Sequence, residues 1–445
     1  MNDYALHIYA GFALVGTLTL EPQANTFALT YDAAWRKRPD RFALSPHLPM
    51  SAPASSATIR RFLENLLPEG RALDVASVYA NIPKSNIFAL VRFLGQETTG
   101  ALSFLPFGQT PQTLAPSHRA IPLNELQERI NTRQQVPFSV WDGKVRMSVA
   151  GYQDKLLVQW DHGQIFLANG SLASTHILKP EPLSPKMPFM VANEHFCMQL
   201  MRRISLRRYA QNWVAVNEIV RVPAPVLLIR RFDRTPAPQG VARHHIIDAC
   251  QALDMNADAK YERNFGNGKD VQHIRDGVSF ARLLAVRERL EVPAVGVQKL
   301  VFWVISTLLL GNSDAHGKNI SFYMRQAGLE VAELYDLVSM VQYDPTSLEH
   351  DLAMAFGDEF SLNGIGVHAL ADFCVRCGIP RTFFARELAA VCTLAGEQAK
   401  EQALDGVYQG GERDFVRGIA ALVEARAKAL LTLATEIPKF RSNAF

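Results

Sequence analysis

Gly311-Asn312-Ser313-Asp314-Ala315-His316-Gly317-Lys318-Asn319 is the most informative stretch of this sequence, and Asp336 follows it after a short β-like segment. The Asp314 carboxylate could accept the proton of an attacking hydroxyl. The Asn319 amide and the Asp336 carboxylate are hard oxygen donors, which suit Mg²⁺ bound to ATP phosphates. The alternative is a polar turn, Gly-Asn-Ser-Asp, that closes a helix before a strand.

The residues before this stretch favour the catalytic interpretation. Residues 296–310 are apolar nearly all round, so they predict a buried helix that fixes the loop after it. A loop held by a buried helix is a rigid platform for a site. The order Asp, Asn, Asp is also the one in which protein kinases place a catalytic base and two Mg²⁺ ligands.

A kinase also needs a cradle for the phosphates and a cation held by an acid. Lys144 to Val149 and Leu156 to Trp160 are expected to form a hairpin whose polar tip could cover phosphates. The tip matches neither G-x-G-x-x-G nor a Walker motif, and an ordinary hairpin is the alternative. The tip residues are Ala150, Gly151, Tyr152, Gln153, Asp154 and Lys155.

Three further segments follow in the expected order. Lys179 ends an apolar strand and is a candidate phosphate-binding lysine, although a strand-end lysine that points to water is the alternative. Glu194 lies near the start of a segment with helical apolar spacing, from which its carboxylate could reach Lys179. The strand Val226 to Arg230 runs into a charged turn and is expected to offer backbone groups to adenine.

Taken together, these words resemble the HipA-like serine/threonine kinase toxins of bacterial type II toxin–antitoxin modules. The shared words are Ser148 to Lys155, Thr175 to Lys179, Asn193-Glu194, Arg231 to Arg234, Asp248 to Gln251, Lys260-Tyr261, Gly311 to Asn319, Tyr335-Asp336 and Leu352 to Met354. Two more, Phe62 to Gly70 and Leu94 to Leu102, extend the resemblance through the amino-terminal part to nearly the whole chain.

The resemblance implies a role for each matching residue around the nucleotide. Asp314 would be the catalytic base, Asn319 and Asp336 the Mg²⁺ ligands, Lys179 the phosphate-binding lysine and Glu194 the acid that positions it. The tip from Val149 to Lys155 would cover the phosphates of ATP. The residues expected to contact adenine and ribose are Arg230, Phe232 and Asp233.

Other matching residues imply regulation or support of the catalytic loop. His316 and Lys318 could touch phosphate or stabilise the loop. Ser148 matches a serine that family members autophosphorylate, which would shut the kinase off. A phosphate there adds nearly two negative charges beside a loop that must bind ATP phosphates, so the two would repel each other.

The sequence departs from the family pattern at two places. Arg230 stands where the family usually has Glu, which puts any side-chain contact of that Glu in doubt. His244-His245-Ile246-Ile247 stands where a Gln-Glu pair is common, which puts surface contacts near the nucleotide in doubt.

Composition agrees with a soluble globular protein. The chain has 445 residues and a formal net charge of +3. Tyr4 to Leu20 predicts a β-hairpin better than a signal peptide, since no basic region leads it. The apolar helix contains Lys299 and is short for a bilayer, so we expect no membrane partner and a cytoplasmic location.

Cysteine usage indicates a reducing compartment. The five cysteines lie in apolar segments and are expected to be buried and reduced. Cys374 and Cys377 form a C-x-x-C pair near His368, for which redox or zinc chemistry is the alternative.

The expected fold class is α+β, a protein-kinase-like two-lobed fold with a β-rich amino-terminal part and a mainly helical carboxy-terminal lobe. Residues 1–137 would form a first subdomain with helices near 57–67 and 72–80. Residues 138–240 would form the β-rich nucleotide lobe and residues 241–445 the helical lobe. ATP would lie in the cleft between the lobes.

Two functions remain open. The first is a Mg·ATP-dependent protein kinase whose substrate, by resemblance, is a translation factor such as an aminoacyl-tRNA synthetase, with growth arrest as the result. The second is a kinase-like corepressor or scaffold with little catalysis. Both imply a DNA-binding antitoxin partner, through which DNA contact would be mostly indirect. The basic clusters Arg202 to Arg208 and Trp35 to Arg38 are expected to be solvated faces rather than direct DNA contacts.

Overall fold

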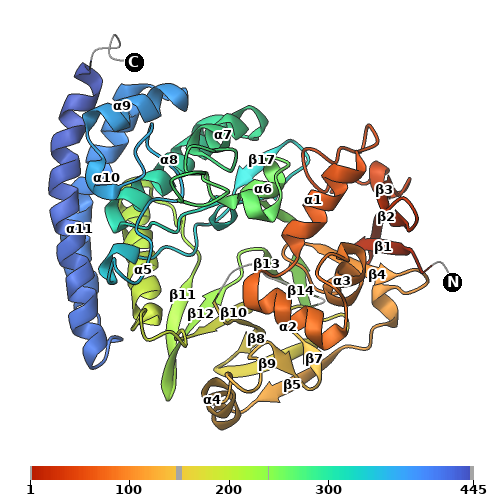
Figure 1. The fold of residues 1–445 in the computed structure, drawn as a ribbon. Coiled ribbons are helices and arrows are strands. Elements are labelled where there is room, and N and C mark those ends of the chain that lie inside the picture. The colour runs from red at the N-terminus through yellow and green to blue at the C-terminus, as the bar shows by residue number, and fades with distance from the viewer. Residues whose placement is uncertain (1–2, 147–152, 239, 441–445) are drawn as a thin grey trace. The chain divides into compact units, whose positions relative to one another are not determined.

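Helix α8 (Pro293–Leu310) is the expected apolar helix, and every residue from Leu300 to Leu310 in it is buried. The computed structural model describes residues 3–146, 153–238 and 240–440 (Figure 1). The chain forms two compact units. Unit 1 comprises Met1–Pro180, Val220–Ala257 and Phe322–Leu329, and unit 2 comprises Glu181–Ile219, Asp258–Ser321 and Glu330–Phe445.

The amino-terminal part of unit 1 contains an antiparallel sheet of strand order β3-β2-β1-β4. The expected hairpin is confirmed: β1 pairs with β2 from Ala5↔Thr19 to Ala10↔Ala13, around Gly11 with φ of 57°. The expected helices near 57–67 and 72–80 are also confirmed. The bounds here are β1 (Ala5–Ala10), β2 (Ala13–Glu21), β3 (Thr26–Tyr31), β4 (Leu102–Pro106), α1 (Ser56–Leu66), α2 (Gly70–Ala80) and α3 (Ile87–Leu94).

A second sheet of unit 1 has the strand order β11-β12-β10-β8-β9-β5, and β11 begins in unit 2. Leu156, Val158, Leu178 and Leu228 belong to the apolar cluster that this sheet buries. The apolar runs predicted as strands therefore form its centre. The bounds are β5 (Ser117–Ile121), α4 (Leu123–Asn131), β8 (Leu156–Asp161), β9 (Gln164–Asn169), β10 (His176–Pro180), β11 (Asn217–Val222) and β12 (Ala224–Arg230).

Of the hairpin expected between Lys144–Val149 and Leu156–Trp160, residues 147–149 lie outside the described residues. Strand β7 (Lys144–Val145) pairs with β6 (Val140–Trp141), whereas β8 pairs with β9 and β10. Asp142 and Gly143 both have positive φ, 49° and 69°, and a two-residue turn of this kind closes a hairpin locally. Lys144 and Val145 therefore pair with the preceding strand β6 across this short turn.

Smaller elements complete unit 1 and lead into unit 2. Strands β13 and β14 pair with each other, and a further sheet has the order β15-β16-β17. The bounds are β13 (Arg234–Ala237), β14 (Gly240–Arg243), β15 (Ile246–Asp248), α6 (Ala249–Ala252), β16 (Ser321–Met324) and β17 (Leu329–Val331). The 3-10 turns are η1 (Trp35–Lys37), η2 (Pro111–Thr113), η3 (Ala257–Lys260), η4 (Val286–Arg289), η5 (Gly317–Asn319), η6 (Met340–Gln342), η7 (Leu362–Gly364) and η8 (Ile437–Lys439).

Unit 2 is mainly helical. Its long helices α10 and α11, drawn in blue, run alongside each other in Figure 1. Basic residues of α5 face acidic residues of α10: Arg208 lies 3.2 Å from Glu387 and Arg203 lies 3.5 Å from Glu401. Two arginines of the cluster Arg202 to Arg208 thus have acidic partners within unit 2. The bounds are α5 (Met190–Tyr209), α7 (Phe280–Ala285), α9 (Val367–Arg376), α10 (Arg381–Ala403) and α11 (Gly411–Glu436).

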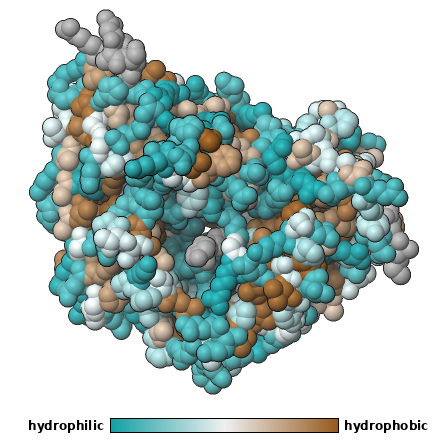
Figure 2. Space-filling model, in the orientation of Figure 1, coloured by the Kyte–Doolittle hydropathy of each residue, from teal (hydrophilic) through white to brown (hydrophobic). Residues whose placement is uncertain are grey.

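Helix α8 has the length and apolar composition of a membrane span, but 72% of it is buried inside the protein. The molecular face in Figure 2 is largely hydrophilic, with hydrophobic residues in scattered patches. Cys197, Cys250, Cys374, Cys377 and Cys392 are all buried and free, as expected. Burial raises the pKa of Cys374 to about 12, so this thiol stays protonated at neutral pH.

A buried ionic network ties the amino-terminal part of unit 1 to the turn after β12. The Asp233 carboxylate accepts hydrogen bonds from Arg231 (2.8 and 3.0 Å), from Arg234 (2.5 Å) and from the Gly100 backbone N–H (2.8 Å). Burial raises the pKa of Asp233, but the two guanidinium groups outweigh it and hold the pKa well below its usual range. The motif Arg231 to Arg234 therefore stabilises the fold by fixing the turn after β12 to the segment around Gly100.

Glu97 extends this network. Its carboxylate accepts from the Ser174 backbone N–H at 2.8 Å and lies 3.5 Å from Arg231. Arg243 donates to the Leu102 carbonyl at 2.7 Å and to the Ser103 hydroxyl at 2.8 Å. The network thus links loop, strand and turn segments that are far apart in the sequence.

Asp233→Ala should lower the free energy of unfolding by about 3–5 kcal/mol, because it removes the carboxylate that accepts hydrogen bonds from two buried guanidinium groups and leaves Glu97 to balance both charges. The matched control is Asp254→Ala, which breaks a pair with Arg61 whose side chains are 21% and 32% exposed. That control should cost about 1 kcal/mol or less. Urea denaturation measures both losses, and equal losses would contradict the role of Asp233 as an anchor.

Candidate functional site

The Gly311–Asn319 loop begins where α8 ends and folds on its own backbone. Gly311 ends the helix with φ of 65°, a left-handed conformation that glycine adopts without strain. The Asp314 carbonyl accepts from the His316 N–H at 2.9 Å and from the Asn319 side-chain amide at 3.2 Å. The loop therefore brings Asp314 and Asn319 together, as the sequence predicted.

Asn312 joins this loop to the segment that carries Asp336. Its Oδ1 accepts from the Asp314 N–H at 3.2 Å, and its Nδ2 donates to the Asp336 carbonyl at 3.3 Å. Its side chain is buried, with 1% of the residue exposed. One amide thus fixes both carboxylate-bearing residues, a role that the sequence interpretation missed.

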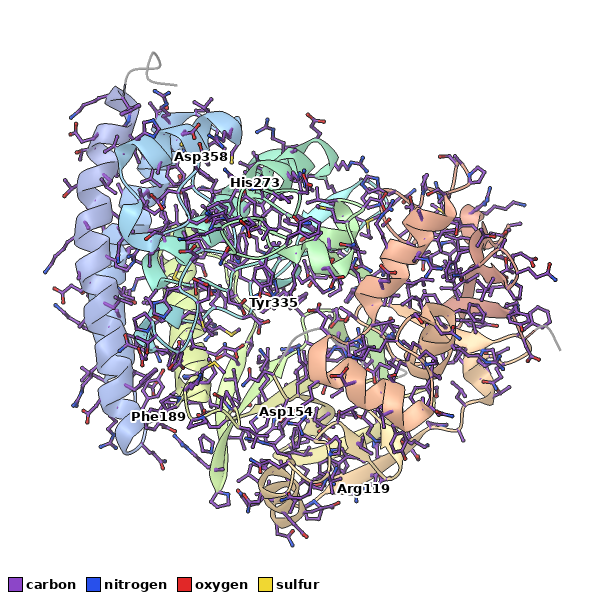
Figure 3. All side chains as sticks on the ribbon, viewed as in Figure 1. Arg119, Asp154, Phe189, His273, Tyr335 and Asp358 are labelled. Carbon is purple, nitrogen blue, oxygen red and sulfur yellow. The ribbon has the colours of Figure 1, made fainter. Side chains whose placement is uncertain are left out.

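Tyr335, labelled in Figure 3, makes a second link between the two segments. Its hydroxyl donates to the Lys318 carbonyl at 2.7 Å and lies 2.8 Å from the Ser321 hydroxyl. Asp336 follows with φ of 51°, a conformation uncommon outside glycine but most accessible to Asp and Asn. Asp314, Asn319 and Asp336 thus form one cluster within unit 2.

His316 and Lys318 are buried, with 7% and 6% of each residue exposed. The His316 Nδ1 accepts from the Lys318 N–H at 3.2 Å, so this ring stabilises the start of η5. Gly317 lies between them and passes close to Val278, since a Cβ there would lie 2.7 Å from a Val278 methyl. These contacts favour the loop-stabilising role for His316.

Tyr261 is a second residue that sequence reasoning left without a role. Its hydroxyl donates to Oδ1 of Asp314 at 2.6 Å. Its ring packs edge-on against the ring of His316, with centroids 5.0 Å apart. Lys260-Tyr261 is one of the motifs shared with the family, but no rule of sequence spacing predicts that Tyr261 contacts Asp314.

Helix α5 supports the segment after Asp336. The Asn193 side chain donates to the Ser339 carbonyl at 3.0 Å and accepts from the Ser339 N–H at 2.8 Å. Glu194 follows in the same helix and is buried, with 2% exposed. Asn193 therefore holds in place the chain that leads away from Asp336, while Glu194 lies in unit 2 and Lys179 in unit 1.

Lys179, the predicted phosphate-binding lysine, lies in strand β10 of unit 1, and Lys155, the last residue of the predicted tip, directly precedes strand β8. Strand β10 pairs with β8 up to Leu178↔Leu156, and Lys179 and Lys155 flank this pair, one residue after Leu178 and one before Leu156. Both lysines are buried, with 6% and 4% exposed. Gln153 donates to the Pro180 carbonyl at 3.1 Å, which holds the end of the tip against β10. Two buried cations beside one strand pair suit a polyphosphate.

Asp154, the residue after Gln153 in the predicted tip, pairs with a different part of unit 1. Its carboxylate lies 3.6 Å from Arg133, and the residue is labelled in Figure 3. The rest of the predicted cradle, Ser148, Val149, Ala150, Gly151 and Tyr152, lies outside the described residues.

The residues of the segment predicted to contact adenine differ in their exposure to solvent. Arg230 is exposed at the end of β12, whereas Asp233 is 3% exposed and belongs to the buried network. The Phe232 carbonyl accepts from the Tyr323 hydroxyl at 3.0 Å. Burial, assisted by the charge of Arg230, lowers the pKa of the neighbouring His176 to about 4. At neutral pH the exposed charge at this strand end is therefore that of Arg230.

Unit 1 also contains a cavity of about 760 Å³ that includes none of the residues predicted for nucleotide or metal. Its lining includes Trp35, Arg41, Phe42, Arg243 and Arg325. The predicted nucleotide residues and this cavity are therefore separate features of unit 1.

The donor set fits Mg²⁺ and ATP. The Asn319 amide and the Asp336 carboxylate offer hard oxygen atoms from segments that Asn312 and Tyr335 hold in place. Lys155 and Lys179 offer buried positive charge to phosphate. Each unit, taken by itself, thus contains donor types that phosphoryl transfer uses.

Comparison with known proteins identifies the family that the chain matches. Residues 147–399 match the family model described as HipA-like C-terminal domain, and residues 6–105 match the HipA N-terminal domain. The chain is 39% identical to the serine/threonine-protein kinase toxin HipA of Shewanella oneidensis, over 87% of this chain and 86% of the relative. A solved structure of Shewanella oneidensis HipA with HipB and operator DNA superposes with a TM-score of 0.87 at 36% identity, covering 98% of this chain and 100% of that one. The expected α+β kinase-like fold is thereby confirmed.

Asn312→Ala should loosen both segments that Asn312 joins. The Asp314 N–H and the Asp336 carbonyl lose their shared partner, which costs about 1–3 kcal/mol when the groups stay buried. Hydrogen exchange should accelerate in peptides covering 311–319 and 335–339. As a matched control, Asn65→Ala removes a buried amide that donates to the Arg61 and Met255 carbonyls in unit 1, and it should leave both peptides unchanged. Unchanged exchange in Asn312→Ala would contradict the bridging role.

Proposed function

This chain belongs to the HipA family of serine/threonine-protein kinase toxins, and from this premise we propose that it transfers the γ-phosphoryl group of Mg·ATP to a protein serine or threonine. The observation that carries the proposal is the cluster in unit 2, where Asn312 bonds to the backbone of both Asp314 and Asp336. Protein kinases need a base and two metal ligands in this order.

Asp314 is the proposed catalytic base. Its carboxylate would accept the proton of the attacking hydroxyl, a task that requires a carboxylate held within hydrogen-bond reach of that hydroxyl. Asn319 and Asp336 would hold Mg²⁺, which when bound neutralises charge on the ATP phosphates. His316 and Lys318 support the part of the loop that joins Asp314 to Asn319.

The residues of unit 1 are proposed to bind the nucleotide. Lys179 and Lys155 would neutralise phosphate charge, and Glu194 would position Lys179. The tip from Val149 to Lys155 would cover the phosphates. Arg230 and Phe232 would contact adenine and ribose. Asp233 belongs to the same segment, and its four internal hydrogen bonds support a role in fixing that turn.

The biological setting is proposed from the relatives. HipA of Shewanella oneidensis was solved with HipB and its operator DNA. We infer that this chain also binds a HipB-like DNA-binding antitoxin and reaches DNA mainly through it. The proposed substrate is an aminoacyl-tRNA synthetase or another translation factor in the cytoplasm, whose phosphorylation would arrest growth.

Regulation by autophosphorylation is proposed at Ser148. A phosphate on this residue would stand beside the tip that is proposed to cover ATP, so it would repel the nucleotide and inactivate the kinase. The exposed Arg230 instead favours the second candidate, a corepressor with weak catalysis, because it departs from the acidic residue usual at this position.

Mass spectrometry of phosphatase-treated protein before and after Mg·ATP tests the proposal. The parent should gain one phosphate on the peptide that contains Ser148. Asp314→Asn should keep the fold but lose transfer by a factor of about 10² or more, since the amide cannot accept the proton.

Three outcomes separate the alternatives. Phosphate on the parent alone supports the kinase and its self-inactivation together. Equal phosphorylation of Asp314→Asn would remove Asp314 as the base. A parent that neither gains phosphate nor binds Mg·ATP would favour the corepressor function.

A further inference from the structure

The Asp314 carboxylate is already engaged before any nucleotide binds. Among the described residues, the donor that reaches it is the Tyr261 hydroxyl, at 2.6 Å from Oδ1. The remaining oxygen, Oδ2, is left to accept another proton donor. A carboxylate with one oxygen fixed has fewer orientations than a free one, which is the condition for efficient general-base chemistry.

The backbone around Tyr261 is braced against the catalytic loop. The Glu262 N–H donates to the Ala353 carbonyl at 2.9 Å, and the Ala353 N–H donates to the Ser313 carbonyl at 3.0 Å. Ala353 therefore links the residue after Tyr261 to the residue before Asp314. The word Leu352-Ala353-Met354, which had no assigned role, acquires one here.

Glu262 strengthens this brace from the opposite side. Its carboxylate accepts from the Ala355 N–H at 2.8 Å and from Arg275 at 2.7 Å, and the residue is 3% exposed. The Gly277 N–H also donates to the Glu262 carbonyl at 3.1 Å. A side chain at Gly277 would collide with the Tyr261 carbonyl, so the close approach requires glycine.

We propose that Tyr261 is a positioning residue for phosphoryl transfer: its hydroxyl holds Oδ1 of Asp314 so that Oδ2 can accept the proton of the substrate hydroxyl. The inference rests on the proposed kinase function. Tyr261 takes no proton and forms no bond to the nucleotide in this role. The rival interpretation is that its hydroxyl occupies the place of the substrate hydroxyl and blocks it.

Tyr261→Phe tests the inference because it removes the hydroxyl and keeps the ring against His316. The initial rate of phosphate incorporation at saturating Mg·ATP should fall about ten- to a hundredfold, the cost of a misplaced catalytic group. The dissociation constant of Mg·ATP should change less than about twofold, because the hydroxyl engages the base and not the nucleotide.

The matched control is Tyr209→Phe. The Tyr209 hydroxyl also donates to a carboxylate in unit 2, Glu387, at 2.9 Å. This control should lose a similar amount of melting temperature and keep the parental rate. A second measurement needs no nucleotide. Tyr261→Phe and Asp314→Ala both remove the same hydrogen bond, the one between the Tyr261 hydroxyl and the Asp314 carboxylate. The melting-temperature loss of the double variant should therefore be smaller than the sum of the two single losses.

Each outcome decides the matter. A parental rate in Tyr261→Phe overturns the positioning role, and a faster rate overturns it in favour of the blocking interpretation. A rate that falls together with Mg·ATP affinity, or additive melting-temperature losses, indicates a merely structural residue and also overturns it. A parent that transfers no phosphate overturns the proposed kinase function itself, whereas an active parent with an unaffected Tyr261→Phe overturns this inference alone.

Discussion

Complete burial of the last turns of α8 is the constraint on which the candidate site depends. An apolar helix without an exposed face in its last turns cannot rotate or slide without opening the core, so its end at Gly311 is fixed. The chain that follows must start at that point, and Asn312 then fixes both Asp314 and Asp336 through its amide. Apolar packing thus fixes the position of the loop, and the hydrogen bonds of Asn312 to backbone groups fix the positions of Asp314 and Asp336.

The site is built mainly from side chains that bind backbone. Asn312, Asn193 and Tyr335 each hold a carbonyl or an N–H of the segments that carry the proposed metal ligands. These contacts are made to backbone groups of the two segments, whereas the Asp314 carboxylate itself accepts from the Tyr261 hydroxyl. Unit 1 uses the opposite arrangement, since the Asp233 carboxylate is saturated by Arg231, Arg234 and Gly100 and serves the fold. Buried aspartate in unit 1 therefore stabilises the fold, whereas the two aspartates of unit 2 belong to the candidate site.

Sequence patterns identified the elements that local physics determines. The apolar run before Gly311, the hairpin at the amino terminus and the strand that carries Lys179 all follow from periodicity and composition. The pairing of Lys144–Val145 with β6 across the Asp142-Gly143 turn was not predicted, because the apolar pattern alone does not show where this short hairpin closes. The contacts of Tyr261 with Asp314 and of Asp233 with Gly100 join residues far apart in the chain, and no local pattern encodes them.

We propose that Asn319 and Asp336 make ATP binding dependent on Mg²⁺. Titration calorimetry of ATP with and without Mg²⁺, on the parent and on Asp336→Asn, measures this dependence. We expect Mg²⁺ to tighten ATP binding at least about tenfold in the parent, and Asp336→Asn to lose most of this gain, because a hard carboxylate ligand is replaced by a neutral amide. Equal ATP affinity with and without Mg²⁺ in the parent would contradict it.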